Sequence, residues 1–197
     1  MPETDEDLVA VYLARGNEDV FAELVKRHLS GVYSFALGLV GQEFAAEDIT
    51  QEVFLKAWKN IRRYDSTLSK FKTWLLRIAR NTCIDYLRKR KSIPFSELAS
   101  PYADDGADTA ALFAERIPDP DPLPDEILAQ AESAEAVVRA VEQLSPRQRE
   151  VLTLHYTEHL TFEEIGHVLG QPTNTVKSRH HRALAALRGI LAPNDAS

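Results

Sequence analysis

A proline-rich stretch limits this chain to two separate folded parts. Six prolines lie between residues 92 and 124, and four of them alternate with other residues in PDPDPLP. Proline lacks a backbone N–H and clashes with the preceding helical turn, so this run cannot form a regular helix or an inner strand. Residues 92–136 also carry eleven acidic residues and one basic residue. We therefore expect a solvated linker at residues 92–125 between two small domains, residues 1–91 and 126–197.

Apolar residues recur at helical spacing on both sides of this linker, which predicts an all-α fold. The first domain is expected to contain a helix at residues 5–14 that ends at Arg15-Gly16-Asn17, and a helix at residues 18–40 that ends at Gly41 and has Leu29 among its regularly spaced apolar residues. Two helices within residues 46–91 follow, joined by a polar loop at Asp65–Ser69. In the second domain we expect four helices, at residues 125–144, 146–156, 161–169 and 173–191, and we expect Val138 of the first of them to point inward.

Two helix-capping sequences and one tight turn indicate how the helices of the second domain are arranged. Ser145 with Gln148, and Thr161 with Glu164, have the spacing of capping boxes. A short helix, a turn at residues 170–172 that contains glycine and proline, and a longer helix together indicate a helix-turn-helix.

The helix that begins near residue 70 has two different faces. On a helical wheel one side is apolar, and Trp74 lies at the border of a second side that holds Lys70, Thr73, Arg77, Asn81 and Arg88. Cations beside an aromatic ring suit unpaired nucleic acid, because the cations meet phosphates and the ring offers a stacking surface. A solvated basic face with a core tryptophan explains the same pattern, and the wheel leaves both interpretations open.

The preceding helix places one leucine in a charged stripe. Its core face is expected to include Ile49 and Val53, with Phe54 and Trp58 widening it. Its other side reads Asp48, Gln51, Glu52, Leu55, Lys59 and Arg62. A single exposed leucine is ordinary. Framed by carboxylates and an amide, it is also typical of an anchor in a protein–protein contact.

Charge is distributed unevenly along the chain. The net charge of −7 argues against nucleic-acid binding when the chain is taken as a whole. Residues 62–91, however, carry ten basic and two acidic residues, whereas acidic residues dominate on both sides. Local patches govern contact with nucleic acid more than the total charge does. The basic segment therefore keeps nucleic-acid binding open.

Motifs for catalysis and metal binding are weak. The single cysteine, Cys83, excludes an internal disulfide framework and a cysteine-rich zinc site, and it is expected to be buried. His155 and His159 have helical metal spacing but no apparent third ligand. There is no glycine-rich phosphate loop and no nucleophile elbow. We expect a protein that is not an enzyme and needs no metal or cofactor; without an apolar run of membrane-spanning length or a signal peptide, we also expect it to be soluble and cytoplasmic.

The last helix presents hydrogen-bonding groups on its outer face. That face is expected to hold Asn174, Lys177, Ser178 and His181, with Arg182 and Arg188 flanking it. Amide, amine, hydroxyl and imidazole groups suit base edges, and arginines suit phosphates. An ordinary polar face is the alternative.

Three stretches together resemble a bacterial RNA polymerase sigma factor of the extracytoplasmic-function (ECF) group, within the sigma-70 family. The family's region 2.2 resembles AEDITQEVFLKAW, and its regions 2.3 and 2.4 resemble FKTWLLRIARNTCIDYLRKR. Its region 4 resembles LSPRQREVLTLHYTEHLTFEEIGHVLGQPTNTVKSRHHRAL. The resemblance covers residues 8–91 and 126–191 in the family's order.

The resemblance implies that the chain binds core RNA polymerase, directs it to specific promoters and assists promoter melting. The clamp helices of the largest subunit would be bound through Asp48, Gln51, Glu52 and Leu55. The −10 element would be met by Asp65, Ser66, Lys70, Trp74, Arg77, Asn81 and Arg88. The −35 element would be read by Asn174, Lys177, Ser178, His181 and Arg182. The flap of the second-largest subunit and an anti-sigma factor are further partners that the resemblance implies.

Two departures and one competing interpretation remain. Asn174 stands where family members often carry glycine, and its amide offers an additional base or phosphate contact. His180 stands where family members carry an apolar residue, so either it is a partly buried neutral histidine or the last helix sits differently on its partner. The competing interpretation is an autonomous helix-turn-helix regulator, or an enzyme domain fused to one. The Leu55 stripe and the basic aromatic helix favour the sigma factor, because a regulator needs neither polymerase docking nor single-strand capture.

Overall fold

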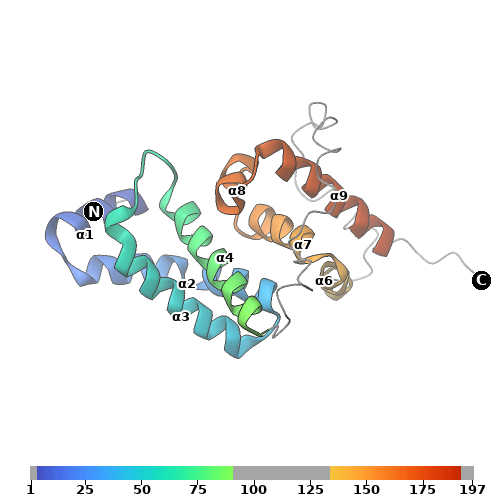
Figure 1. The fold of residues 1–197 in the computed structure, drawn as a ribbon, viewed down its shortest axis with the longest axis horizontal. Coiled ribbons are helices and arrows are strands. Elements are labelled where there is room, and N and C mark those ends of the chain that lie inside the picture. Colours follow the sequence, from blue (N-terminus) through green and yellow to red (C-terminus); the bar gives the residue numbers. More distant parts are fainter. Residues whose placement is uncertain (1–3, 91–133, 192–197) are drawn as a thin grey trace, which may run out of the picture. The chain divides into compact units, whose positions relative to one another are not determined.

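The computed structural model describes residues 4–90 and 134–191, and these residues form helices and turns without any strand (Figure 1). They fall into two compact units. The first contains α1 to α4, and the second contains α6, α7, α9 and most of α8. The all-α expectation is confirmed for these ranges. The expected linker at 92–125 and the expected helical turns at 125–133 lie outside the described residues.

The first unit closely follows the pattern of its apolar residues. It consists of α1 (Asp5–Arg15), α2 (Glu18–Val40), α3 (Glu43–Asn60), the short 3-10 turn η1 (Ile61–Arg63) and α4 (Phe71–Arg90). Two helices end at glycines in the left-handed conformation, Gly16 with φ 65° and Gly41 with φ 70°. Glycine adopts this conformation without strain from a side chain, and each cap N–H donates to a carbonyl four residues earlier.

The core of this unit lies between α2, α3 and α4. Phe35, Ile49, Phe71 and Leu75 are buried there, and so is Cys83, as expected. The helical wheel was wrong at three positions: Trp58 is 47% exposed, Leu29 is 49% exposed, and Thr73 is only 1% exposed. A wheel gives the angle of a side chain but not the width of the arc that neighbouring helices cover, and α4 packs against α1, α2 and α3.

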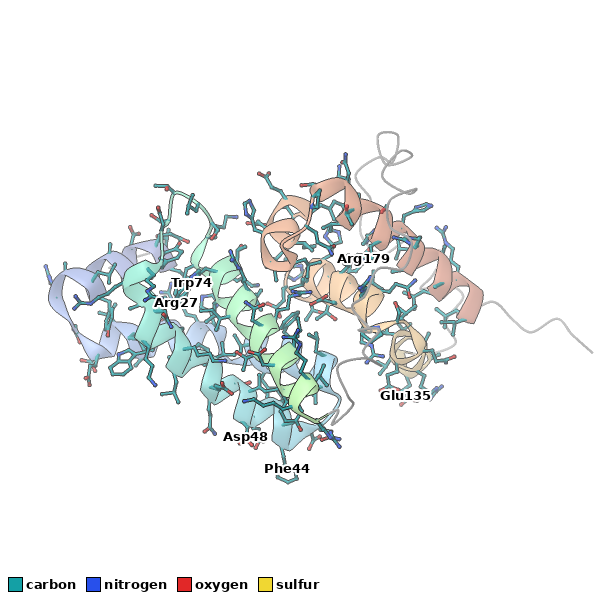
Figure 2. The ribbon with its side chains drawn as sticks, in the orientation of Figure 1. Arg27, Phe44, Asp48, Trp74, Glu135 and Arg179 are labelled. Carbon is teal, nitrogen blue, oxygen red and sulfur yellow. The ribbon has the colours of Figure 1, made fainter. Side chains whose placement is uncertain are left out.

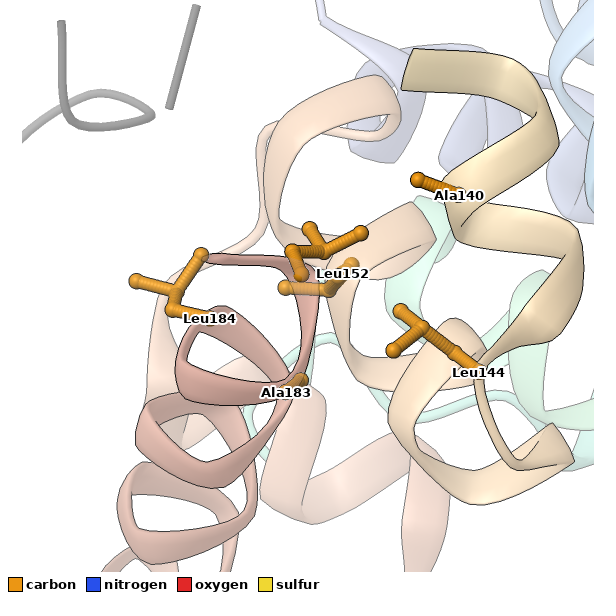
Figure 3. Close-up of a cluster of buried hydrophobic side chains, with 6 residues drawn as sticks. Ala140, Leu144, Leu152, Ala183 and Leu184 are labelled. Carbon is orange, nitrogen blue, oxygen red and sulfur yellow. The ribbon is translucent and has the colours of Figure 1, made fainter. Parts of the chain in front are cut away.

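The second unit is held together by a separate core. Its elements are α6 (Ala134–Gln143), α7 (Pro146–Leu152), the π-helical turn η3 (Thr153–Thr157), α8 (Phe162–Leu169) and α9 (Thr173–Leu191). Residues of α6, α7 and α9 pack around a shared apolar cluster (Figure 3), which contains Ala140, Leu144, Leu152, Ala183, Leu184 and Leu187. Val138 was expected to point inward, but it is 58% exposed, so that expectation was wrong.

Both predicted capping boxes are present. Ser145 and Gln148 exchange hydrogen bonds at the start of α7, and Thr161 and Glu164 do so before α8. The turn between α8 and α9 confirms the helix-turn-helix: Gly170 has φ 65°, and Gln171 N–H donates to the carbonyl of Gly166 at 2.9 Å. A Cβ at Gly166 would lie 2.8 Å from the Gln171 carbonyl oxygen, so this tight turn requires glycine in the preceding helix.

Candidate functional site

The polar stripe of α3 faces solvent as predicted. Asp48, Gln51 and Glu52 are exposed, and Leu55 is 56% exposed. Figure 2 shows Asp48 on the same helix as Phe44, which projects from the first turn and is 84% exposed. The stripe therefore presents carboxylates, an amide and large apolar groups together, although its binding role stays a prediction.

A groove beside Leu55 extends this surface. It has a volume of about 690 Å³ and runs between α2 and α3. From α3 it is lined by Leu55 and Trp58, and from α2 by Phe21, Val25 and Leu29. Sequence reasoning missed it, because Trp58 and Leu29 were both assigned to the core. An apolar residue at the border of a core face is the signal that would have indicated it.

The basic face of α4 is open along most of its length. Lys70, Arg77, Asn81 and Arg88 are all exposed, as the wheel predicts. Trp74 is half-buried, with its ring centroid 5.4 Å from that of Tyr64 and 5.7 Å from that of Phe71. The tryptophan therefore packs against core residues and keeps part of its ring exposed, and nucleic-acid binding by this face stays a prediction.

The loop before α4 is internally ordered. The Asp65 carboxylate accepts hydrogen bonds from the Thr67 hydroxyl at 2.7 Å and from the Thr67 N–H at 2.9 Å. These bonds stabilise the charged carboxylate and hold the pKa of Asp65 below its ordinary value. Ser66 is exposed, and Leu68, which the sequence reasoning did not single out, is 71% exposed. An apolar side chain in an otherwise polar loop was the available signal.

The outer face of α9 is narrower than predicted. Asn174 and His181 are exposed, whereas Lys177 and Arg182 are half-buried. Lys177 Nζ lies 5.8 Å from the ring centroid of Phe162, and Arg182 Nε donates to the carbonyl of Ser178. Ser178 is only 7% exposed, and its hydroxyl donates to the carbonyl of Thr175 at 3.1 Å, so its expected place on the outer face was wrong.

His180 is buried in a ring cluster. It is 1% exposed, and its Nε2 lies 3.0 Å from the Tyr156 hydroxyl oxygen. The rings of His155 and Phe162 each lie 5.1 Å from it, centroid to centroid. Burial, reinforced by the neighbouring histidines His155 and His181, lowers the pKa of His180 to about 4. Of the two alternatives for this departure, the structure supports the buried histidine, and the lowered pKa favours its neutral form.

Neither a metal-binding cluster nor a membrane-spanning helix occurs in the described residues. Within residues 4–90 and 134–191, no group of three or more histidine, cysteine, aspartate or glutamate side chains is arranged to hold a metal ion. His155 instead has its Nδ1 2.9 Å from the Leu160 carbonyl oxygen. Among the helices of the described parts, none has the length and hydrophobicity that crossing a membrane requires.

Family models match both units. The model of sigma-70 region 2 matches residues 24–93, and the model of sigma-70 region 4 matches residues 134–187. The first match contains the α3 stripe and the basic face of α4. The second contains the helix-turn-helix.

Whole-chain relatives agree with these matches. The ECF RNA polymerase sigma factor SigW of Bacillus subtilis (strain 168) is 34% identical over 88% of this chain and 90% of its own length. The ECF RNA polymerase sigma factor SigE of Mycolicibacterium smegmatis is 32% identical over 97% of this chain and 70% of its own length. Both alignments span the two units described above.

Solved structures have the same fold. CnrH in complex with the cytosolic domain of CnrY has a TM-score of 0.65 and 25% identity, covering 98% of this chain and 99% of that one. The sigma factor RpoE in complex with the anti-sigma factor NepR, from Bartonella quintana, has a TM-score of 0.61 and 23% identity, covering 89% and 98%. The two family models and the whole-chain relatives show that the chain belongs to the ECF RNA polymerase sigma factors.

Proposed function

We propose that this sigma factor binds core RNA polymerase and directs it to specific promoters by contacting their −10 and −35 elements. One observation carries the proposal: the first unit exposes a polar stripe with an apolar anchor on α3 and a basic face with an amide on α4. These surfaces suit different partners, a protein and a nucleic acid. An autonomous helix-turn-helix regulator needs neither, and RNA synthesis itself would be the chemistry of the polymerase.

Docking to the polymerase would use the α3 stripe and the adjoining groove. Asp48, Gln51 and Glu52 supply polar contacts, and Leu55 beside Trp58 supplies exposed apolar area. A helical partner with basic and apolar residues fits this surface, as the clamp helices of the largest polymerase subunit would. Leu55→Glu should weaken core binding by about 2 kcal/mol or more, the size of an interface hot spot.

Leu68→Glu is the matched control for this experiment, because Leu68 is also an exposed leucine of the first unit but lies in the loop before α4. Affinity for core polymerase is measured for both variants by a pull-down titration. Wild-type affinity in Leu55→Glu would refute the docking surface. Equal losses in both variants would mean that the added charge, and not the position, weakens binding.

Capture of the −10 element would use the loop and α4. The exposed Lys70, Arg77 and Arg88 would meet phosphates, and Asn81 would contact a base. Asp65 and Ser66 lie in the loop, and Trp74 offers part of a ring at the border of the basic face. Asn81→Ala should alter preference at one −10 position in transcription from a randomised promoter library. An unchanged profile would remove Asn81 from base reading.

The −35 element would be met by α9. Asn174 and His181 are the exposed candidates for base edges, and Lys177 and Arg182 are placed at the borders of the same face. Transcription with purified core polymerase tests the function as a whole: addition of the chain should make initiation dependent on the promoter. A helix-turn-helix regulator would bind the same DNA without changing which promoters the core enzyme uses.

Regulation by an anti-sigma factor is part of the proposal. In the solved structures, CnrH holds the cytosolic domain of CnrY, and RpoE holds the anti-sigma factor NepR. A partner covering the α3 stripe of the present chain would compete with the polymerase. The contact with the flap of the second-largest subunit and the location in the cytoplasm belong to the same proposal.

A further inference from the structure

The residue at the N-cap position of α4 cannot cap the helix with its own side chain. Trp74 N–H donates to the carbonyl of Lys70, which makes Lys70 the N-cap residue. A lysine side chain has no acceptor for the free N–H groups of the first turn. Lys70 and Lys72 also place positive charge at the end of the helix where the helix dipole is positive. This start is therefore unfavourable by local rules, although it lies directly after the loop proposed to capture the −10 element.

A carboxylate from α1 supplies the missing acceptor. Glu6 Oε1 accepts a hydrogen bond from the Phe71 N–H at 2.9 Å, across 65 positions of sequence. The same oxygen lies 3.4 Å from the Tyr64 hydroxyl, which donates to the carbonyl of Ser69 at 2.9 Å. Tyr64, which directly precedes the loop, therefore contacts its far end at Ser69, and Glu6 contacts both Tyr64 and the first residue of α4. Burial, together with the negative charge of Glu6, raises the pKa of Tyr64, so the hydroxyl remains a donor.

The neighbouring aspartate fixes α1 in place. Asp5 Oδ2 lies 2.6 Å from His28 Nε2, and Asp5 Oδ1 lies 3.2 Å from Arg27 Nη1, so α1 is tied to α2. The ring centroid of His28 in turn lies 5.6 Å from that of Phe71, the residue whose N–H donates to Glu6. The first turn of α1 therefore contacts both α2 and the start of α4.

We propose that Glu6 is a positioning residue for −10 recognition, holding the loop at residues 65–70 and the first turn of α4 in register. The inference rests on the proposed role of that loop and helix in −10 capture. Glu6 need not touch DNA, since it acts through the Phe71 N–H and through Tyr64. Without it, the N-terminus of α4 would fray, and Lys70 and the loop would lose their fixed geometry.

Three variants in the full chain, each assembled with core polymerase, test this role. Glu6→Ala removes the acceptor, whereas Glu6→Gln keeps a carbonyl oxygen at the same place. Asp19→Ala is the matched control: Asp19 is an exposed acid of the same unit, in the first turn of α2. Binding of a single-stranded −10 oligonucleotide and selection from a randomised −10 library are measured beside affinity for core polymerase.

For Glu6→Ala we expect oligonucleotide binding to fall about five- to tenfold, the effect that loss of an N-cap has on an equilibrium, with a flattened −10 profile. Affinity for core polymerase should stay unchanged. Glu6→Gln should recover most of the loss, and Asp19→Ala should behave like the wild type.

Two results overturn the inference while leaving the proposed function intact. One is an unchanged −10 profile in Glu6→Ala when Asn81→Ala changes it. The other is a loss of core binding in Glu6→Ala as large as the loss of oligonucleotide binding, because Glu6 would then only hold the fold. If neither Glu6→Ala nor Asn81→Ala affects −10 selection, the assignment of α4 to the −10 element fails, and this inference fails with it.

Discussion

The two helices proposed to meet promoter DNA, α4 and α9, differ in how the fold prepares them. The start of α4 depends on a carboxylate from a distant helix, and its basic face is otherwise open. The start of α9 follows a local turn built around Gly170, and part of its polar face is covered by contacts within its own unit. An open face can be predicted from helical spacing alone, whereas a face inside a compact motif depends on its neighbours.

The variant with the largest expected effect tests whether the local turn at residues 170–172 holds the start of α9 in place. Gly166→Ala would place a Cβ 2.8 Å from the Gln171 carbonyl oxygen, and relieving such an overlap should destabilise the second unit by about 1–3 kcal/mol. Hydrogen exchange of the full chain, followed by mass spectrometry, should show faster exchange in peptides of α8 and α9 but not of α4.

Gly189→Ala is the matched control for this change. Gly189 lies in α9 with no atom within 4 Å of an added Cβ, so alanine should stabilise the helix by up to about 1 kcal/mol. Equal exchange rates in Gly166→Ala and the wild type would show that the turn tolerates a side chain and that its tight geometry does not fix α9.

The stability of α9 should depend on pH through His180, which distinguishes α9 from α4. His180 has a pKa of about 4 in the folded chain, below its ordinary value of 6.5, so the unfolded state binds more protons between these two values. Stability is therefore complete above pH 6.5 and decreases as the pH falls toward 4, by about 3 kcal/mol.

His180→Leu is expected to remove most of this dependence, because leucine does not titrate. Hydrogen exchange of α9 peptides, measured at several pH values and corrected for intrinsic exchange, checks the prediction. An identical pH dependence in the variant and the wild type would mean that His180 is charged in the folded chain, or that another group controls the stability of α9.

Much of this architecture follows from local sequence rules. The ends of α1 and α2 at Gly16 and Gly41, and the capping boxes at Ser145 and Thr161, depend on residues within one turn of each other. These features were predicted because short-range hydrogen bonds decide them. The exposed positions of Arg77 and Asn81 were predicted for a related reason, since no helix of the first unit covers their side of α4.

The missed features depend on contacts between elements distant in sequence. Thr73 is buried by the helices around α4, and Trp58 lies beyond the area that α2 covers. The Glu6 contact with Phe71 spans 65 positions, and no periodicity or cap motif indicates it. His180 was left open between two alternatives, because only the position of Tyr156 shows that a buried imidazole has a partner.

Removing one phosphate contact should weaken promoter binding by a smaller amount, and by a similar amount on α4 and on α9. Arg77 on α4 is exposed, and Arg182 on α9 is half-buried. Arg77→Gln and Arg182→Gln should each weaken promoter binding about uniformly across sequences, and each should reduce the salt slope by about 1. Promoter affinity is titrated at four salt concentrations. A change in base preference would show that the arginine reads a base and does not merely neutralise a phosphate.

The smallest expected effect concerns the α9 residue at which sequence and structure disagree. The Ser178 hydroxyl is directed back to the Thr175 carbonyl, and the side chain is almost fully covered, so it should not reach a base edge. Ser178→Ala should then leave the −35 profile unchanged and alter stability by less than about 0.5 kcal/mol, because alanine is the better helix former. His181→Ala, at an exposed position three residues later, should cost about 1–3 kcal/mol at one or two base pairs. Transcription from a randomised −35 library compares the two variants. If Ser178→Ala changes the −35 profile and His181→Ala does not, α9 presents to DNA a different face from the one that is exposed in the structure. In that case α9 would differ from α4, because the face of α4 that is proposed to bind DNA is the exposed one.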